Sequence, residues 1–425
     1  MNQTHIAIIG AGASGLMAAY KAADTMQKQG EVVSVTVLEG NVRAGKKLLA
    51  TGNGRCNLTN TQISAINYHG DSKADEIALR LSAEEVMEEF EKMGILCRQD
   101  EAGRVYPHNL QAAAVLKALR SACEEKGVKF LYEYNVFSML HMADGFLLKS
   151  ENGHEILADI CILASGGQAS PKHSCGMNGY ALAKQMGHTV TKLAPVLTPV
   201  LCKEKVISSI KGMRCKANAV LEGDGIPLYY ESGEVIFAEK ALSGICIFNI
   251  SVLVADFMRF GLVKGKKYKN LTIVLDLAEN IEEHTLKNYL KQSCQSYPNR
   301  DVGDLLNGVI NMKIGEELLK SLKFNRSRPF SSLTNAEIEL IVKTLKAWRF
   351  SVSGLGDWEK AQVTAGGVPL SEIQTHTMQS SKMQGFYLTG EVLDVHGDCG
   401  GFNLHFAWVS GLLAGKAAAK NIIII

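Results

Sequence analysis

A glycine-rich turn between a short apolar run and a small-residue segment constrains this chain more than any other feature. The run His5-Ile6-Ala7-Ile8-Ile9 is typical of a buried parallel strand, and Leu16 to Gln29 is typical of a helix. Between them stands a G-x-G-x-x-G turn made of Gly10, Ala11, Gly12, Ala13, Ser14 and Gly15. A strand, this turn and a helix in that order predict a dinucleotide-binding α/β domain.

Each glycine of the turn has a mechanical role in holding a dinucleotide. Gly10 permits the tight turn, Gly12 lets the backbone approach a pyrophosphate, and Gly15 lets helix and strand pack closely. The start of the helix offers N–H groups and the positive end of its dipole to the same anion. A second strand, Val33 to Leu38, ends at Glu39, whose carboxylate can accept hydrogen bonds from ribose hydroxyls. An acid at that place disfavours a 2′-phosphate, so NADP is not expected in this site.

A second glycine-rich segment, near the C-terminus, predicts that the dinucleotide is FAD. A strand beginning at Gly385 ends in a turn with Gly390 and Glu391, and a helix follows from about His405 to Ala419. Between them lies a long turn that contains Gly400-Gly401. The acid can bind ribityl hydroxyls, and a helix start favours the anionic reduced flavin. A plain loop with a glycine cap would not explain these features together.

A third segment completes the predicted nucleotide site. Asp159 to Leu163 is typical of a buried strand, and it ends in the small-residue turn Ala164-Ser165-Gly166. We expect the chain to pass back over the dinucleotide at this turn. Val136, in the preceding strand, is expected to flank the adenine.

The block from Gly45 to Asn60, GKKLLATGNGRCNLTN, resembles the signature of the BaiN/aminoacetone-oxidase-type family of NAD(P)/FAD-dependent oxidoreductases. The resemblance continues through residues 103–107, 179–183, 195–199 and 361–368 and into the C-terminal segment. It implies a Rossmann-like, glutathione-reductase-type FAD domain split by an inserted β-rich domain, which in turn carries a small helical subdomain. Residues 173–178 and 108–111 depart from the expected pattern, so no substrate is taken over from a relative.

The domain boundaries follow from this resemblance and from the residue patterns. Strand-like segments punctuated by glycine run from about 196 to 276, and helical periodicity runs from 277 to about 348. The predicted α/β fold therefore has a first FAD-binding part at 1–194 and a second part at 361–425. The β-rich substrate domain covers 195–276 and 349–360, and the helical subdomain covers 277–348.

The resemblance also implies which residues line the flavin. Gly52 to Asn57 and Thr364 to Gly367 should border the isoalloxazine ring, and Lys46 and Arg55 should steady the pyrophosphate or the reduced ring. The residues expected to bind FAD are Gly10, Gly12, Ala13, Ser14, Gly15, Glu39, Lys46, Gly52, Gly54, Arg55, Cys56, Asn57, Val136, Ala164, Ser165, Gly166, Thr364, Gly366, Gly390, Glu391, Asp394, Gly400, Gly401, Phe402, Asn403 and Leu404.

Histidines are the natural acid–base candidates, because their titration range covers neutral pH. His396 is our first prediction for a catalytic group, ahead of His108 and His405, with Arg55 as a second catalytic candidate. A satisfied structural histidine is the alternative in each case. A redox role for Cys56 is disfavoured because no C-x-x-C pair is present. No metal site is predicted, since no spacing matches a zinc pattern.

The overall charge bears on the partners. The chain has 45 basic and 43 acidic residues, a balance that gives no reason to expect nucleic acid or an anionic membrane as the main partner. The ten cysteines form no secreted disulfide framework, so we expect reduced thiols and a cytoplasmic location. No window is apolar enough to span a membrane. The oligomeric state is not predicted.

The predicted function is an FAD-dependent oxidoreductase that acts on a small organic substrate. One direction is NAD(P)H-driven reduction of an unsaturated compound, and the alternative is amine oxidation with oxygen. A second complete dinucleotide fingerprint is missing, so NADH or NADPH would dock without a Rossmann domain of its own. A tRNA-modifying flavoprotein and a non-catalytic flavin-binding protein are further alternatives.

Overall fold

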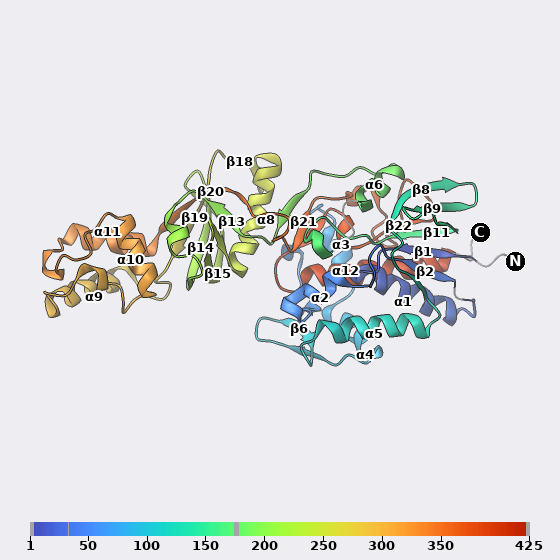
Figure 1. The fold of residues 1–425 in the computed structure, drawn as a ribbon, viewed down its shortest axis with the longest axis horizontal. Helices are drawn as coiled ribbons and strands as arrows, with labels where there is room; N and C mark the ends of the chain where they lie inside the picture. The colour runs from blue at the N-terminus through green and yellow to red at the C-terminus, as the bar shows by residue number, and fades with distance from the viewer. Residues whose placement is uncertain (1–3, 33, 174–177, 422–425) are drawn as a thin grey trace. The chain divides into compact units, whose positions relative to one another are not determined.

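The chain folds into two compact units, the second of which is inserted into the first. The computed structural model describes residues 4–32, 34–173 and 178–421, so Val33 and residues 174–177 of the sequence predictions lie outside the described residues. The first unit comprises residues 1–195 and 362–425, and the second comprises residues 196–361. Figure 1 follows the chain by colour from the N-terminus to the C-terminus.

A five-stranded parallel sheet forms the centre of the first unit (Figure 1). Its order is β22 (Phe386–Leu388), β11 (Ile160–Leu163), β1 (Ile6–Ile9), β2 (Val35–Leu38) and β7 (Lys129–Leu131). All residues of β1, β2 and β11 are buried, as is typical of a parallel sheet covered on both faces. Strands from both ends of the chain therefore share one sheet, and this confirms the predicted split α/β domain.

Two long helices lie side by side in the first unit because small residues let their backbones approach. α1 (Ala13–Lys28) packs along α12 (Phe402–Asn421). A Cβ atom on Gly415 of α12 would lie 2.2 Å from the carbonyl oxygen of Ala18, and one on Gly411 would lie 2.5 Å from that of Ser14. The other helices of the unit are α2 (Lys46–Ala50), α3 (Ala74–Ala78), α4 (Ala83–Lys92), α5 (Ala112–Glu125) and α6 (Asn178–Gln185).

Short strands outside the parallel sheet complete the first unit. A three-stranded sheet has the order β10 (Glu155–Ala158), β9 (Gly145–Ser150) and β8 (Val136–Met142). Another has the order β3 (Thr59–Asn60), β6 (Arg104–Pro107) and β5 (Cys97–Gln99). Two-stranded pairs join β4 (Tyr68–Gly70) to β23 (Val395–Gly397) and β12 (Ala194–Val196) to β21 (Val363–Ala365). The β4–β23 pair joins segments more than 300 residues apart in the chain.

The inserted unit is a closed six-stranded barrel with a helical segment inserted between two of its strands. The barrel order is β13 (Val200–Cys202), β16 (Ala241–Ser243), β15 (Ile226–Ala238), β14 (Arg214–Gly223), β19 (Leu271–Asp276) and β20 (Trp348–Leu355). A hairpin joins β17 (Leu262–Val263) to β18 (Lys266–Lys267), and the helices are α7 (Val206–Ser209), α8 (Ile245–Phe260), α9 (Glu283–Ser296), α10 (Met312–Ser321) and α11 (Asn335–Lys346). The helices α9 to α11 fall between β19 and β20 in the chain, and one apolar core serves the unit.

Two elements differ from the sequence-based expectation. α8 is a helix of 16 residues inside a stretch that we expected to be strand-like. Its run Ile-Ser-Val-Leu-Val is rich in β-branched residues, and most of its side chains are buried, so it lacks the polar stripe that marks a surface helix. α12 begins at Phe402 rather than near His405, which places residues 402–404 in the first turn of the helix.

Candidate flavin site

Two positions of the turn at residues 10–15 accept only glycine, one for its backbone conformation and one for lack of space. Gly10 has a φ of 106°, and a Cβ there would lie 2.5 Å from the carbonyl oxygen of Ala164. A Cβ on Gly15 would lie 2.0 Å from the carbonyl oxygen of Gly10. The N–H of Gly10 donates to the carbonyl of Leu38 at 2.8 Å, which ties the turn to β2. The turn thus follows β1 in the chain, is hydrogen-bonded to β2 and packs against the residue after β11.

The N-terminus of α1 is arranged for an anion. Gly12 is the N-cap residue, and no described side chain caps the helix there. A Cβ on Gly12 would have no atom within 4 Å, and the same is true of Gly166 in the turn after β11. Ala13 and Ser14 open the helix with their N–H groups in its first turn. Uncapped N–H groups beside open space form a phosphate-binding arrangement.

Glu39 lies at the end of β2, where a ribose is expected. Its side chain is buried and accepts hydrogen bonds from the N–H of Ala11 at 2.9 Å and from the N–H of Asn41 at 2.8 Å. Lys46 donates to Oδ1 of the same Asn41, so it lies at this end of the site. The N–H of Tyr134 donates to the carbonyl of Glu39 at 2.9 Å, which brings the chain entering β8 alongside. The buried Val136 opens that strand two residues later.

A second acid, Glu391, anchors the middle of the site. Its carboxylate forms an ion pair with Lys47 at 2.6 Å and accepts from the N–H of Thr364 at 2.9 Å. Gly390 before it has a φ of 73°, and a Cβ there would lie 2.5 Å from Oγ of Ser14. Lys47, which the sequence reasoning did not single out, thus connects the GKKLLA segment to the C-terminal acid. Lys46 and Lys47 are adjacent in the sequence, and nothing in the sequence indicated that Lys46 binds Asn41 whereas Lys47 binds Glu391.

Asp394 closes a small polar network beside Gly366. Its Oδ2 accepts from the hydroxyl of Thr191 at 2.7 Å, and its Oδ1 accepts from the N–H of Gly366 at 3.1 Å. The hydroxyl of Thr191 also accepts from the N–H of Gly367 at 3.1 Å. These contacts tie the 364–367 segment to the turn after β22, as the predicted site requires. Thr191 was missed because it stands in no recognisable motif.

The segment 52–60 packs against the glycine turn before α12. Asn60 donates from Nδ2 to the carbonyl of Gly400 at 2.9 Å. A Cβ on Gly401 would lie 2.5 Å from the carbonyl oxygen of Thr59 and 2.8 Å from Oδ1 of Asn57. The structure therefore brings together the two glycine-rich segments that were predicted to border the flavin, although about 340 residues separate them in the chain.

The remaining predicted residues of this region differ in exposure. Gly52, Gly54 and Arg55 are exposed, and Gly401 and Leu404 are half-buried beside the buried Phe402. Arg55 lies close enough to Tyr106 to affect its hydroxyl electrostatically. Cys56 is fully buried, and burial raises the pKa of its thiol to about 12. A buried thiol with such a pKa carries almost no thiolate at neutral pH, which opposes a redox role.

Two buried polar atoms support the fit of FAD. Oδ1 of Asn57 and Oγ of Ser165 are buried, and neither has a hydrogen-bond partner among the described residues. Such atoms carry a desolvation cost unless a ligand or a water satisfies them. Ser165 belongs to the turn after β11 and Asn57 to the segment beside Gly401, the two places where the cofactor is expected. Together with the open space beside Gly12, these two unsatisfied atoms indicate that the residues of this site fit FAD.

The three histidine candidates have different environments. His396 is 1% exposed on β23, where it pairs with His69 of β4, and the two rings lie 5.7 Å apart. His405 is fully buried, with Nδ1 bound to the hydroxyl of Thr59 at 2.8 Å and Nε2 near the carbonyl of Ala78 at 3.0 Å. Burial lowers the pKa of His405 to about 4 despite these carbonyl contacts. His108 is exposed.

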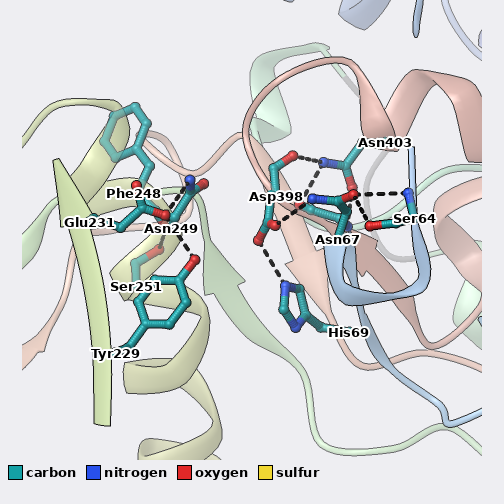
Figure 2. Close-up of polar contacts among 11 residues, drawn as sticks. Ser64, Asn67, His69, Tyr229, Glu231, Phe248, Asn249, Ser251, Asp398 and Asn403 are labelled. Atoms are coloured by element: carbon teal, nitrogen blue, oxygen red, sulfur yellow. Dashed lines mark hydrogen bonds and ion pairs between the residues drawn. The ribbon is translucent and has the colours of Figure 1, made fainter. Parts of the chain in front are cut away.

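Figure 2 shows a polar cluster that the sequence reasoning missed. Nε2 of His69 lies 2.8 Å from Oδ1 of Asp398, and Asn67 donates to the other carboxylate oxygen at 3.3 Å. Asn403, in the first turn of α12, donates to the carbonyl of Gly397 at 2.8 Å. No sequence motif pointed to Asp398 or to His69 as functional residues.

The inserted unit has its own polar cluster, also drawn in Figure 2. The hydroxyl of Tyr229 donates to Oε1 of Glu231 at 2.8 Å, and Asn249 donates to the same oxygen at 3.0 Å. Tyr229 and Glu231 lie on β15, and Asn249 lies on α8. The cluster fixes α8 to the barrel wall.

These features define the class of protein: the chain is an FAD-dependent oxidoreductase with a Rossmann-type domain. It matches the HI0933-like protein Rossmann domain over residues 4–417, and it belongs to that family. This confirms the family resemblance, the fold class, the enzyme class and the flavoprotein character that the sequence predicted.

Curated relatives match over almost the whole chain. A 3-dehydro-bile acid delta(4,6)-reductase from Clostridium scindens is 35% identical, with 98% of this chain and 99% of the relative covered. The ribosomal RNA dihydrouridine synthase of Escherichia coli is 25% identical, with 98% and 97% covered. The Haemophilus influenzae synthase is 26% identical, with 97% and 98% covered. No helix of the described residues is both long and apolar enough to cross a membrane.

Proposed function

We propose that this flavoenzyme reduces a carbon–carbon double bond conjugated to a carbonyl group in a small organic substrate, with NADH or NADPH as electron donor. The observation that carries the proposal is the 35% identity, over 98% of the chain, to a protein named as a bile acid reductase. The polar contacts around Glu39, Glu391 and Asp394 support FAD as the redox group.

The names of both kinds of relative describe the same change of bonds. A delta-reductase saturates a ring double bond, and a dihydrouridine synthase saturates the pyrimidine double bond beside a carbonyl. Reduction of an activated double bond is therefore the chemistry that the relatives have in common. Amine oxidation, the alternative direction, finds no support among these names.

The chain's own residues bind and orient the reactants. FAD, when bound, supplies the hydride chemistry of the reaction. Gly12 and the N-terminus of α1 would hold its pyrophosphate, Glu39 its ribose and Glu391 its ribityl chain. The 52–57 segment and the turn at 400–401 would border the ring and limit the access of water to it.

An anaerobic titration tests the proposal. The purified holoprotein is titrated with NADH and then with NADPH while the visible flavin band is followed, and a steroid with a 3-oxo-4,6-diene is then added. Bleaching by a nicotinamide and recovery on addition of the dienone are expected. If an amine bleaches the flavin and neither nicotinamide does, the oxidase alternative replaces the reductase.

Ribosomal RNA is the second candidate substrate, because the two synthases are 25–26% identical over nearly the whole chain. The balance of 45 basic and 43 acidic residues gives no general attraction for a phosphate backbone, which favours the small substrate. An unmodified ribosomal RNA transcript should therefore not reoxidise the reduced protein. Reoxidation by the transcript and not by the dienone would reverse this order.

A further inference from the structure

Saturation of a conjugated double bond needs a proton as well as a hydride. The hydride adds to the β-carbon, and a proton adds to the α-carbon. An acid in the protein must supply that proton if water is kept from the site. If this acid is a histidine, one ring nitrogen should be held by a hydrogen bond, and the other should be free to give its proton to the substrate.

His69 of β4 has both properties. Its Nε2 lies 2.8 Å from Oδ1 of Asp398, and an ionised carboxylate can only accept, so Nε2 carries a proton and donates. Nδ1 of His69 makes no hydrogen bond to any residue in the ranges that the structure describes. The side chain of His69 is 25% exposed, whereas that of Asp398 is 12% exposed. One nitrogen is therefore anchored, and the other, on a side chain that is partly exposed, has no hydrogen-bond partner within those ranges.

Three other histidines of the first unit lack this combination. His188 has a fully buried side chain, with Nδ1 on Glu372 at 2.8 Å and Nε2 on Ser380 at 2.9 Å. His5 and His405 likewise use both ring nitrogens for hydrogen bonds. Each of these three histidines is fixed on two sides and has no nitrogen available for proton transfer.

Asp398 is held firmly enough to orient the imidazole ring (Figure 2). Its N–H donates to the carbonyl of Asn67 at 3.0 Å, and the side chain of Asn67 donates back to its carboxylate at 3.3 Å. Asn403 donates to the carbonyl of Asp398 at 3.3 Å. We call His69 and Asp398 the dyad. Pairing of His396 with His69 across β23 and β4 fixes the backbone at His69. Two titratable groups lie against the His69 ring: Asp398, 2.8 Å from Nε2, and His396, whose ring lies 5.7 Å away. Asp71 and Asp394 approach the backbone of the neighbouring Gly70.

The dyad belongs to the region where the flavin ring is expected. Asp398 stands two residues before Gly400, which accepts a hydrogen bond from Asn60, and three before Gly401, which packs on Asn57 and Thr59. Asp398, which binds His69, thus stands next in the chain to the turn that packs on Asn57, whose buried Oδ1 has no hydrogen-bond partner among the described residues.

We propose that His69 is the proton donor of the reaction and that Asp398 is its positioning residue. The inference rests on the proposed function. His69 begins as the imidazolium, with protons on both nitrogens, and its Nδ1 proton passes to the α-carbon as the β-carbon takes up the hydride. The electron pair of the double bond forms the new C–H bond at the α-carbon. His69 is left neutral, keeps its Nε2 hydrogen bond to Asp398, and regains a proton from water.

The test separates the two half-reactions in the holoprotein. His69→Asn, Asp398→Asn and the control His154→Asn, an exposed histidine, are compared with wild type in anaerobic stopped-flow measurements. His69→Asn should leave reduction by the nicotinamide unchanged and slow reoxidation by the 3-oxo-4,6-diene at least ~100-fold. Asp398→Asn should slow the same step about 10-fold. His154→Asn should change neither step.

A second measurement needs no turnover. In ¹⁵N-histidine-labelled holoprotein, the signal lost in His69→Asn should report the Nε2–H tautomer when the ring is neutral, and Asp398→Asn should disturb it. An Nδ1–H tautomer would overturn the assignment. Equal loss of both half-reactions in His69→Asn, or no loss, would also overturn it. If the dienone does not reoxidise even wild type, the proposed function fails, and the inference fails with it.

Discussion

The two ends of the candidate flavin site are built in different ways. At the expected nucleotide end, one contiguous stretch forms the turn, and the close approaches there are to backbone atoms at Gly10 and Gly15. At the ring end, side chains from segments more than 300 residues apart meet at Asn60–Gly400 and His69–Asp398. The first end depends on the absence of side chains, whereas the second depends on side-chain contacts as well as on the glycine at 401. Substitutions should therefore act differently at the two ends.

The largest effect is expected for Gly15→Ala at the nucleotide end. The new methyl group would lie 2.0 Å from the carbonyl oxygen of Gly10, a backbone atom that cannot rotate away. We expect a loss of about 3 kcal/mol or more in the unfolding free energy of the apoprotein. Urea denaturation without FAD measures it. An apoprotein of wild-type stability would show that the turn is looser than the structure indicates.

Gly12→Ala should separate folding from cofactor binding. A Cβ at Gly12 meets no atom within 4 Å, and its φ of −84° suits alanine, so the apoprotein should lose less than about 1 kcal/mol. A pyrophosphate at the start of α1 would meet the methyl group, and FAD affinity should fall about 100-fold, or about 2.7 kcal/mol. Fluorescence titration of the apoprotein with FAD gives the affinity. Unchanged affinity would place the pyrophosphate elsewhere.

The same contrast explains what the sequence could predict. The turn at residues 10–15, Glu39 and the sheet of β1, β2 and β11 were predicted because their signals are local and each glycine has a steric reason. The His69–Asp398 dyad was not predicted, because pairing of β4 with β23 depends on tertiary structure. α8 was missed because its buried β-branched residues hide helical periodicity. The predicted cofactor contacts and the catalytic role of His396 stay predictions.

A pH effect should mark the ring end. Burial lowers the pKa of His405 to about 4 from its ordinary 6.5, so the unfolded chain binds a proton there more readily than the folded chain. The neutral, buried His405 therefore contributes fully to the unfolding free energy above pH 6.5, and this contribution is lost as the pH falls towards 4. Between pH 7.5 and 5 we expect a loss of about 2 kcal/mol in unfolding free energy.

Denaturation of wild type and His405→Gln at both pH values measures this contribution. The variant should be less stable at pH 7.5 and should depend less on pH. Burial also lowers the pKa of His188, which acts in the same direction and window, so some pH dependence should remain in the variant. Glu372, whose pKa is about 2, loses its contribution only at lower pH. A variant with the full wild-type slope would remove His405 as the cause.

The smallest effect is expected for the ion pair between Lys47 and Glu391, which links the two ends. Their side chains are 27% and 19% exposed, and the N···O distance is 2.6 Å. A double-mutant cycle with Lys47→Met and Glu391→Gln should give a coupling of about 1 kcal/mol in the unfolding free energy. The exposed pair Lys211–Glu239 is the control and should give no measurable coupling. Equal coupling energies in the two pairs would show that the ion pair with Lys47 adds nothing specific. Glu391 would then be positioned mainly by the backbone around Gly390.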